Sequence, residues 1–283
     1  MTRLAVTGAS GFLGRHVLPA LSRTNAEVVA HARTLRPDHV ASPRLRWTGF
    51  DVAAPGDAFD RLGHPDIVIH LAWAGLPNYL SPTHVEAELP AQTRFLRGLV
   101  VSGLKRLVVA GTCFEYGMQS GCLREDTAAS PSNPYGTAKD RLRQELEQLR
   151  ETFPFDLRWL RLFYLYGSGQ GPASLYSQFT AAVARGDKRF DMSPGDQVRD
   201  FMAVEEAASA IVAVAMAPQA PVILNVCSGT PVTIRSLVEK WRADSAADIE
   251  LNPGVFPYPA YEPFAFWGDN GRLRALLGQP KSP

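Results

Sequence analysis

The chain has 283 residues, 46% of them hydrophobic, and a formal net charge of +1 at pH 7. This length and apolar content suit one large domain, or one with a small second lobe, and the near-zero charge excludes a global field that would recruit nucleic acid or an anionic membrane. The apolar runs fall short of the ~18 residues of a membrane span, and three cysteines without metal-ligand spacing predict reduced thiols in a cytoplasmic protein that holds no metal.

The chain opens with a glycine-rich unit of strand, turn and helix. An apolar strand over residues 4–6 runs into Gly8, Gly11 and Gly14, and a helix is predicted over about 12–23. Gly8 permits a tight turn, Gly11 lets the backbone approach a pyrophosphate, and Gly14 lets the helix pack closely on the sheet. The free N–H groups at the helix N-terminus then face the phosphate charge. The Gly-x-x-Gly-x-x-Gly spacing differs from the usual fingerprint, but its place between a strand and a helix favours a dinucleotide-binding turn over an ordinary glycine turn.

Strands and helices then alternate for about two-thirds of the chain. Strands are predicted at 27–33, 45–51, 67–72, 107–110 and 157–163, and helices over about 83–102 and 133–151. Near-continuous apolar strands separated by helices indicate a parallel sheet covered on both faces. We therefore predict an α/β fold: a doubly wound parallel sheet (Rossmann fold) over 1–166, to which 198–228 returns, and a small C-terminal substrate lobe from 167–197 and 229–283.

The end of the second strand bears on the type of dinucleotide. An acid there would bind both ribose hydroxyls of NAD, whereas an arginine suits the 2′-phosphate of NADP. This chain has no acid there and offers Arg33, with His31 and Arg36 nearby. The sequence therefore favours NADP(H), and NAD(H) stays possible because these arginines could be ordinary surface residues. Asp51, after the third strand, is expected either to hold the adenine amino group or to serve as a loop carboxylate or helix cap.

Three residues in the middle of the chain can together move a proton. Tyr135 and Lys139 are four apart at the start of the predicted long helix, so both side chains project from one helix face. A lysine ammonium beside a phenol stabilises the phenolate, so we expect the pKa of Tyr135 to fall from its ordinary ~10 towards working pH. Thr112 stands at the carboxyl end of the preceding strand, where doubly wound folds place their ligands. Its hydroxyl could hold the same substrate oxygen that Tyr135 protonates, which predicts general acid–base chemistry.

At these motifs the chain resembles the extended short-chain dehydrogenase/reductase family, which comprises nucleotide-sugar epimerases, dehydratases and ketoreductases. The resemblance covers nearly the whole length and rests on residues 7–14, 70–72, 112–117, 135–139, 161–167 and 199–201. It implies that Thr112, Tyr135 and Lys139 form a catalytic triad and that Lys139 also binds the nicotinamide ribose. It further implies that Arg199 meets the diphosphate of a nucleotide sugar, a role that suits a planar guanidinium. An ion pair with an acid such as Asp200 or Glu205 is the alternative for Arg199.

The resemblance and the motifs together predict two sets of contacts. The residues expected at the cofactor are Gly8, Ser10, Gly11, Phe12, Leu13, Gly14, His31, Arg33, Asp51, Val52, Leu71, Ala72, Ala74, Tyr135, Lys139 and Phe163. The residues expected at the substrate are Asn78, Thr112, Cys113, Phe114, Tyr164, Arg199 and Tyr258.

Departures from the family pattern narrow the predicted reaction. The family's 4,6-dehydratases carry two acids after the threonine, where this chain has Cys113 and Phe114. Glu115 comes one position late, and by strand alternation it should point to the other face, so dehydration is disfavoured. Tyr164 stands where most members carry Asn. The aromatic segment 252–267 is expected either to shape the sugar pocket or to pack the small lobe, and residues 71–79 resemble those of 6-deoxy-4-ketohexose nucleotide reductases.

We therefore predict an NADP(H)-dependent reductase of the C4 ketone of a nucleotide-activated 4-keto-6-deoxysugar, with Tyr135 as the general acid. Two alternatives stay open: an NAD-dependent nucleotide-sugar 4-epimerase with the same triad, and a dinucleotide-sensing binding protein without catalysis. The helices at about 83–102 and 134–151 either pair across a two-fold axis to form a homodimer, as the family commonly does, or only cover the sheet.

Overall fold

The computed structural model describes residues 1–258 and 262–279. A seven-stranded sheet comprises β1 (Arg3–Thr7), β2 (Glu27–Ala32), β3 (Leu45–Gly49), β4 (Ile67–His70), β5 (Arg106–Thr112), β7 (Asp156–Leu162) and β11 (Ile223–Val226). The strand order is β11-β7-β5-β4-β1-β2-β3, and every neighbouring pair is parallel. In this doubly wound order the topology switches between β1 and β4, and ligands bind outside the carboxyl ends of the strands there. The predicted fold class is confirmed.

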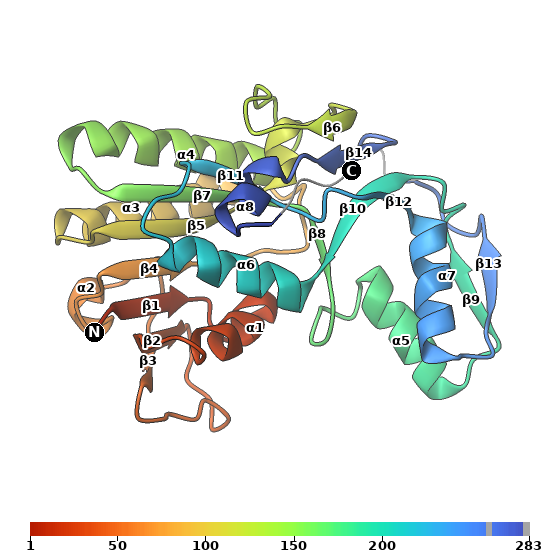
Figure 1. The fold of residues 1–283 in the computed structure, drawn as a ribbon, viewed down its shortest axis with the longest axis horizontal. Coiled ribbons are helices and arrows are strands. Elements are labelled where there is room, and N and C mark those ends of the chain that lie inside the picture. The colour runs from red at the N-terminus through yellow and green to blue at the C-terminus, as the bar shows by residue number, and fades with distance from the viewer. Residues whose placement is uncertain (259–261, 280–283) are drawn as a thin grey trace.

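Helices cover both faces of the sheet (Figure 1). On one face lie α1 (Phe12–Leu21) and α6 (Val204–Met216), and on the other lie α2 (Ala58–Arg61), α3 (Leu89–Val101) and α4 (Pro134–Thr152). The side chains of β1 alternate between the two cores: Leu4 and Val6 face α1 and α6, whereas Ala5 faces the opposite core. All three are fully buried, which is why the strand is a continuous apolar run rather than an alternating one. Within the described residues, no helix is long and apolar enough to span a membrane.

The helix predicted over 83–102 has two parts. Residues His84–Glu88 form a π-helical turn, and the regular helix α3 follows directly. Such turns are rare and occur frequently at functional sites. The other elements predicted in the sheet domain are present, with small differences at their ends.

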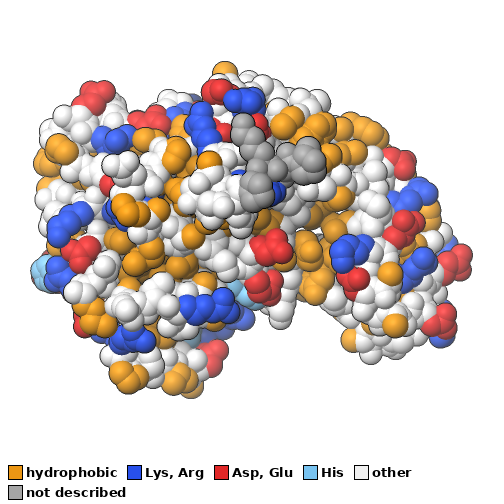
Figure 2. Space-filling model, in the orientation of Figure 1, with side chains coloured by type: hydrophobic (Ala, Val, Ile, Leu, Met, Phe, Trp, Pro, Cys, Tyr) orange, Lys and Arg blue, Asp and Glu red, His pale blue; other side chains and the backbone are white. Residues whose placement is uncertain are grey.

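The C-terminal part of the chain adds three small sheets that the sequence analysis did not predict. One contains β8 (Tyr164–Tyr166), β10 (Val198–Ala203) and β12 (Pro231–Thr233); β9 (Arg189–Met192) pairs with β13 (Glu250–Pro253), and β6 (Gly121–Leu123) pairs with β14 (Phe266–Gly268). The helices α5 (Leu175–Arg185) and α7 (Ile234–Ser245) pack around their own core, which includes Phe179 and Trp241, while α8 (Gly271–Leu276) lies against β11. The α5–α7 lobe stands beside the sheet in Figure 1, and Figure 2 shows a notch in the surface between them.

Candidate active site

Thr112 ends β5 and begins the next turn of the chain. A short 3-10 helix follows at Cys113–Tyr116, and Thr112 caps it, because its hydroxyl accepts a hydrogen bond from the Phe114 backbone N–H at 3.3 Å. Since Oγ1 accepts that bond, its own proton is left to donate to another oxygen. The cap thus sets the direction of the Thr112 hydroxyl at the carboxyl edge of the sheet.

Tyr135 lies in the first turn of α4, directly beside this cap. Asn133 starts the helix, since its side-chain oxygen accepts a hydrogen bond from the Gly136 N–H at 2.8 Å. A Cβ on Gly136 would stand 2.5 Å from the Phe114 carbonyl oxygen, so the start of α4 packs directly on the turn after β5. This contact brings the Tyr135 phenol within hydrogen-bond reach of the Thr112 hydroxyl.

Lys139 follows Tyr135 by one helical turn and reaches the same place. Its Nζ donates to the Ala110 carbonyl oxygen at 2.8 Å and lies 5.9 Å from the centre of the Tyr135 ring. Burial lowers the pKa of Lys139 to about 7, against the charges of Glu115 and Glu88, which raise it. The structure therefore brings together the three residues that the sequence predicts to move a proton.

The phenol of Tyr135 is harder to ionise than the sequence analysis predicts. Burial raises its pKa well above the ordinary value, and the hydrogen bond with Thr112 opposes only part of that rise. The expectation of a lowered phenol pKa is wrong for this structure, because loss of hydration disfavours the phenolate and the Lys139 ammonium is directed at the Ala110 carbonyl. A protonated phenol is, however, the form that a general acid requires.

An aromatic wall surrounds Tyr135. The ring centres of Tyr79, Trp73 and Phe114 lie 5.5, 5.9 and 6.3 Å from that of Tyr135. These rings replace water around the phenol, which is the origin of its raised pKa. The sequence analysis took cofactor and substrate residues from 71–79 but missed Trp73 and Tyr79; the available signal was two large aromatics following a central strand.

Glu115 points into the core between β5 and β7. Its Oε2 accepts from Arg161 Nε at 2.8 Å, and its Oε1 accepts from Trp159 Nε1 and the Thr112 backbone N–H, both at 2.9 Å. The sequence analysis expected Glu115 to face away by strand alternation, but the strand has already ended at Thr112. The orientation has another cause: Glu115 completes a capping box with Thr112 in the 3-10 turn. Burial also raises the pKa of the neighbouring Cys113 thiol, which leaves no ready acid at that position.

The glycine turn has the geometry of a dinucleotide site. Gly8 has a φ of +72°, and a Cβ there would stand 2.7 Å from the Ala72 backbone nitrogen. A Cβ on Gly14 would stand 2.4 Å from the Gly8 carbonyl oxygen, so Gly14 lets α1 close on the turn itself rather than on the sheet face. Gly11 precedes the first residue of α1, and the helix N-terminus is thereby open to a phosphate.

A cavity of about 420 Å³ extends from this turn along the carboxyl ends of β2 and β4. Arg33 and Arg36 line it on the β2 side, together with His31, whose Nε2 donates to the Phe50 carbonyl oxygen at 2.9 Å and whose pKa burial lowers. The residues of the predicted cofactor set that line the cavity are Gly8, Ser10, Gly11, His31, Arg33, Asp51, Val52, Leu71, Ala72 and Ala74. Its lining and the glycine turn fit an extended dinucleotide.

Some predicted cofactor contacts lie outside this cavity. Phe12 and Leu13 belong to the first turn of α1, and Phe163 is buried in a cluster with Tyr116 and Phe266. Asp51 lines the cavity and also accepts a hydrogen bond from the Ala53 N–H at 2.9 Å, so the loop-capping alternative for this carboxylate is present.

Arg199, which the sequence predicts to contact the substrate, forms an ion pair with a carboxylate of this chain. It is 1% exposed, and its Nη2 and Nε donate to Glu262 Oε2 at 2.9 and 3.3 Å. Its Nη1 donates to the backbone oxygens of Val198 and Phe264. The ion pair foreseen as the alternative therefore forms, but with Glu262, which lies far along the chain and gave no sequence signal.

The remaining predicted substrate residues are spread over two places. Tyr164 lies 6.4 Å from Phe114, ring centre to ring centre, and so adjoins the aromatic wall. The Asn78 carbonyl oxygen bonds to His84 next to that wall. Tyr258 lies instead on the lobe, where its hydroxyl accepts from the Asp196 N–H at 3.1 Å. In the described part of the chain, no group of three His, Cys, Asp or Glu side chains is placed to hold a metal ion.

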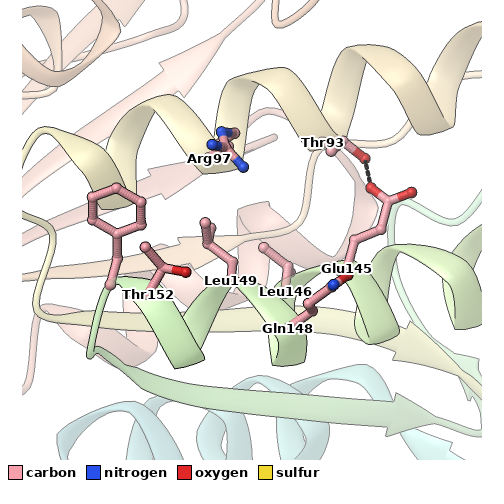
Figure 3. Close-up of a pocket in the computed structure, with 8 residues that line it drawn as sticks. Thr93, Arg97, Glu145, Leu146, Gln148, Leu149 and Thr152 are labelled. Atoms are coloured by element: carbon pink, nitrogen blue, oxygen red, sulfur yellow. Dashed lines mark hydrogen bonds between the residues drawn. The ribbon is translucent and has the colours of Figure 1, made fainter.

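A second hollow, of about 380 Å³, lies away from these residues on the outer side of α3 and α4 (Figure 3). Thr93 and Arg97 come from α3, and Glu145, Gln148 and Thr152 from α4. Thr93 donates to Glu145 at 2.6 Å across the two helices. This hollow lacks the residues that would do chemistry and belongs to a helix surface.

Comparison with known proteins identifies the family. The model of the NAD dependent epimerase/dehydratase family matches residues 4–227. The chain therefore belongs to that family, and it is an NAD(P)-dependent nucleotide-sugar oxidoreductase of the extended short-chain dehydrogenase/reductase type.

Two curated relatives and one solved structure cover most of the chain. It is 28% identical to the dTDP-6-deoxy-L-talose 4-dehydrogenase (NAD(+)) of Aggregatibacter actinomycetemcomitans, over 94% of this chain and 98% of that protein. It is also 28% identical to the dTDP-6-deoxy-L-talose 4-dehydrogenase (NAD(P)(+)) of Kitasatospora kifunensis, over 88% of this chain and 81% of that protein. The structure of MoeE5 in complex with UDP-glucuronic acid and NAD is similar with a TM-score of 0.84 and 26% identity, and the match covers 99% of this chain and 94% of that one.

Proposed function

We propose that this chain reduces the C4 ketone of a nucleotide-activated 4-keto-6-deoxysugar with NADPH, with Tyr135 as the general acid. The observation that carries the proposal is the convergence of Thr112, Tyr135 and Lys139 at the carboxyl end of β5. Trp73, which contacts both Tyr135 and Lys139, lines the dinucleotide cavity. The two relatives named as 4-dehydrogenases of a dTDP-6-deoxysugar support the sugar class and the C4 position.

Each of the three residues has a distinct part in this reaction. When bound, the dinucleotide supplies hydride transfer to the C4 carbon. The protonated Tyr135 phenol donates its proton to the C4 oxygen as negative charge develops there. Thr112 donates a hydrogen bond to the same oxygen, and the Lys139 ammonium lowers the energy of the phenolate that remains. Water is kept out by the aromatic wall, which strengthens these interactions.

The aromatic wall also supports a 6-deoxysugar. The rings of Tyr79 and Phe114 lie 4.8 Å apart, centre to centre, and Tyr164 continues the wall. An apolar wall favours a C6 methyl group over a C6 hydroxyl, which would lose its hydrogen bonds to water. The lobe formed by 167–197 and 229–283 is assigned to the nucleotide-sugar side of the site, and residues 1–166 with 198–228 to the cofactor side.

The decisive assay uses purified protein, NADPH and a panel of dTDP- and GDP-linked 4-keto-6-deoxysugars, with loss of NADPH absorbance as the signal. Tyr135→Phe should reduce turnover by a factor of at least about 10² while NADPH binding is nearly unchanged. Tyr176→Phe, in the lobe core, is the matched control and should keep full activity. Turnover without added NADPH, by protein that retains cofactor, would instead indicate a 4-epimerase, and unchanged turnover of Tyr135→Phe would remove the phenol from the mechanism.

The preference for NADP(H) over NAD(H) is supported by the two arginines that line the cavity. Arg33 and Arg36 face the end of β2, where this chain has no acid to bind a 2′-hydroxyl. Arg33→Asp should weaken NADPH binding more than NADH binding in a fluorescence titration. Arg23→Asp makes the same charge change outside the cavity and should alter neither. Equal losses for both cofactors in Arg33→Asp would contradict the preference.

We also propose a cytoplasmic homodimer. Its interface would be the outer side of α3 and α4, where the exposed Arg97 borders the hollow of Figure 3. Three free cysteines agree with a reducing compartment. Arg97→Glu places a second acid near Glu145 and should shift the sedimentation equilibrium towards the monomer; a wild-type protein that sediments as a monomer would contradict the proposal.

A further inference from the structure

The indole of Trp73 stands over the ammonium of Lys139. Nζ lies 3.9 Å from the centre of the Trp73 ring, well within the ~6 Å of a cation–π contact. Lys139 is 2% exposed, so few water molecules can solvate the charge, and the ring face stabilises it together with the Ala110 carbonyl oxygen that accepts from Nζ at 2.8 Å. Trp73 also lines the dinucleotide cavity and lies 5.9 Å from the Tyr135 ring, between the predicted cofactor site and the phenol.

The ring of Trp73 is held in place by a histidine. Trp73 Nε1 donates to His84 Nδ1 at 3.1 Å, and His84 Nε2 bonds to the Asn78 carbonyl oxygen at 2.8 Å. An indole N–H can only donate and a carbonyl can only accept, so His84 is the neutral tautomer with its proton on Nε2. His84 is fully buried, and a Cβ on Gly75 would stand 3.0 Å from its Cε1, so the loop packs closely on the imidazole.

The π-helical turn His84–Glu88 explains how two side chains reach this loop together. His84 begins the turn and bonds to Trp73, while Glu88 ends it and accepts a hydrogen bond from the Ala74 N–H at 3.1 Å. Both side chains contact the loop after β4 from the two ends of the π-helical turn. One helical turn thus holds two consecutive loop residues, Trp73 and Ala74. Such π-helical turns are rare and occur frequently at functional sites.

We propose that Trp73 is a positioning residue for Lys139, held by His84, that keeps the ammonium charged and fixed between Tyr135 and the cofactor site. This inference rests on the proposed function for the importance of Lys139 in the reaction. Trp73 itself need not touch the reacting atoms, since its contact with Lys139 determines where Nζ stands and how readily it is protonated.

Several other titratable groups lie close to Lys139, and their charges are coupled to its protonation. Glu115 in the 3-10 turn and Glu88 in the π-turn both raise its pKa, and burial lowers it by more, to about 7. His70 on β4 is close enough for Lys139 to act on its pKa, and Tyr135 shares the helix. A cation–π contact stabilises only the charged form, so loss of the ring face should lower the pKa of Lys139 further.

The test measures the Lys139 titration directly by NMR of protein labelled with ¹³C at lysine Cε, without cofactor or substrate. Trp73→Leu removes the ring face and should lower the pKa of Lys139 by about one unit. Trp73→Phe keeps a ring but loses the donor to His84, and His84→Phe loses the acceptor; both should give smaller shifts. Trp47→Phe, at the far edge of the sheet, should give none. Lys139→Met assigns the signal.

A Lys139 pKa that is unchanged or raised in Trp73→Leu would overturn the proposal. If Trp73→Leu does not fold, Trp73→Phe and His84→Phe provide the test instead. A Lys139 pKa that is unchanged in both of these variants would also overturn the proposal. Where the wild type reduces a 4-keto sugar, the pH at which kcat is half-maximal should move with the Lys139 pKa in each variant, while the KM for the sugar changes little. Should the wild type show no such turnover, the proposed function fails and the titration still tests Trp73.

Discussion

The buried pair of Glu115 and Arg161 allows the most exact prediction. Glu115 is fully buried and Arg161 is 2% exposed, and the carboxylate accepts three hydrogen bonds between 2.8 and 2.9 Å. Glu115→Gln keeps the shape but removes the charge and places an amide N–H₂ against groups that donate. Removal of one partner of a buried pair costs about 3–5 kcal/mol, because the other charge is left buried without compensation.

This loss is large relative to the whole protein. Folded domains are stable by about 5–15 kcal/mol, and for a chain of this size each kcal/mol lowers the melting temperature by about 2–3 °C. We therefore expect Glu115→Gln to lower the free energy of unfolding in urea by about 4 kcal/mol and the melting temperature by about 10 °C. The amide oxygen can still accept from the Thr112 backbone N–H when its N–H₂ faces Arg161, so the loss comes from the unpaired guanidinium rather than from the Thr112 contact.

The double variant Glu115→Leu/Arg161→Met is the control for this reasoning. It removes both charges and fills the space with apolar groups, so it should be clearly more stable than Glu115→Leu alone. Two results would refute this reasoning. One is a loss of unfolding free energy below about 1 kcal/mol in Glu115→Gln, and the other is a loss in the double variant that equals the sum of the losses in the two single variants.

Three further predictions follow from single positions. Gly8→Ala should abolish dinucleotide binding and destabilise the fold by more than Gly56→Ala; both residues have positive φ, but a Cβ meets backbone at 2.7 Å only at Gly8, and equal effects in urea unfolding would contradict this. Burial lowers the pKa of His70 to about 3, so below pH 6.5 the unfolded chain binds a proton that the native one does not, and stability should fall by up to about 1.4 kcal/mol per pH unit towards pH 3. His70→Gln should flatten that slope between pH 6.5 and 5, and an unaltered slope would show that other groups cause it. Glu262→Gln frees Arg199 and should tighten binding of UDP or dTDP several-fold in calorimetry, whereas unchanged affinity would show that Arg199 does not meet the diphosphate.

Two arguments of the sequence analysis failed for different physical reasons: one left out the loss of hydration around a side chain, and the other left out the end of a strand. The Lys139 ammonium was expected to lower the pKa of Tyr135, but removal of water around the phenol has the larger effect and raises it. The direction of Glu115 was argued from strand alternation, although a capping box at the end of β5 determines it. Neither hydration nor the end of a strand can be read from residue spacing alone.

The alternation of strands and helices along the chain, the glycine turn, and the pairing of Tyr135 with Lys139 could be derived from the sequence alone. These features depend on local periodicity and on steric requirements of one or a few neighbouring residues. Three contacts could not be derived in this way, because each joins residues from different elements. They are the contacts of Glu262 with Arg199, of His84 with Trp73, and of Trp73 with Lys139. Such contacts are decided only when the helices and loops have packed on the sheet, since the free energy of burying a charge depends on everything that surrounds it.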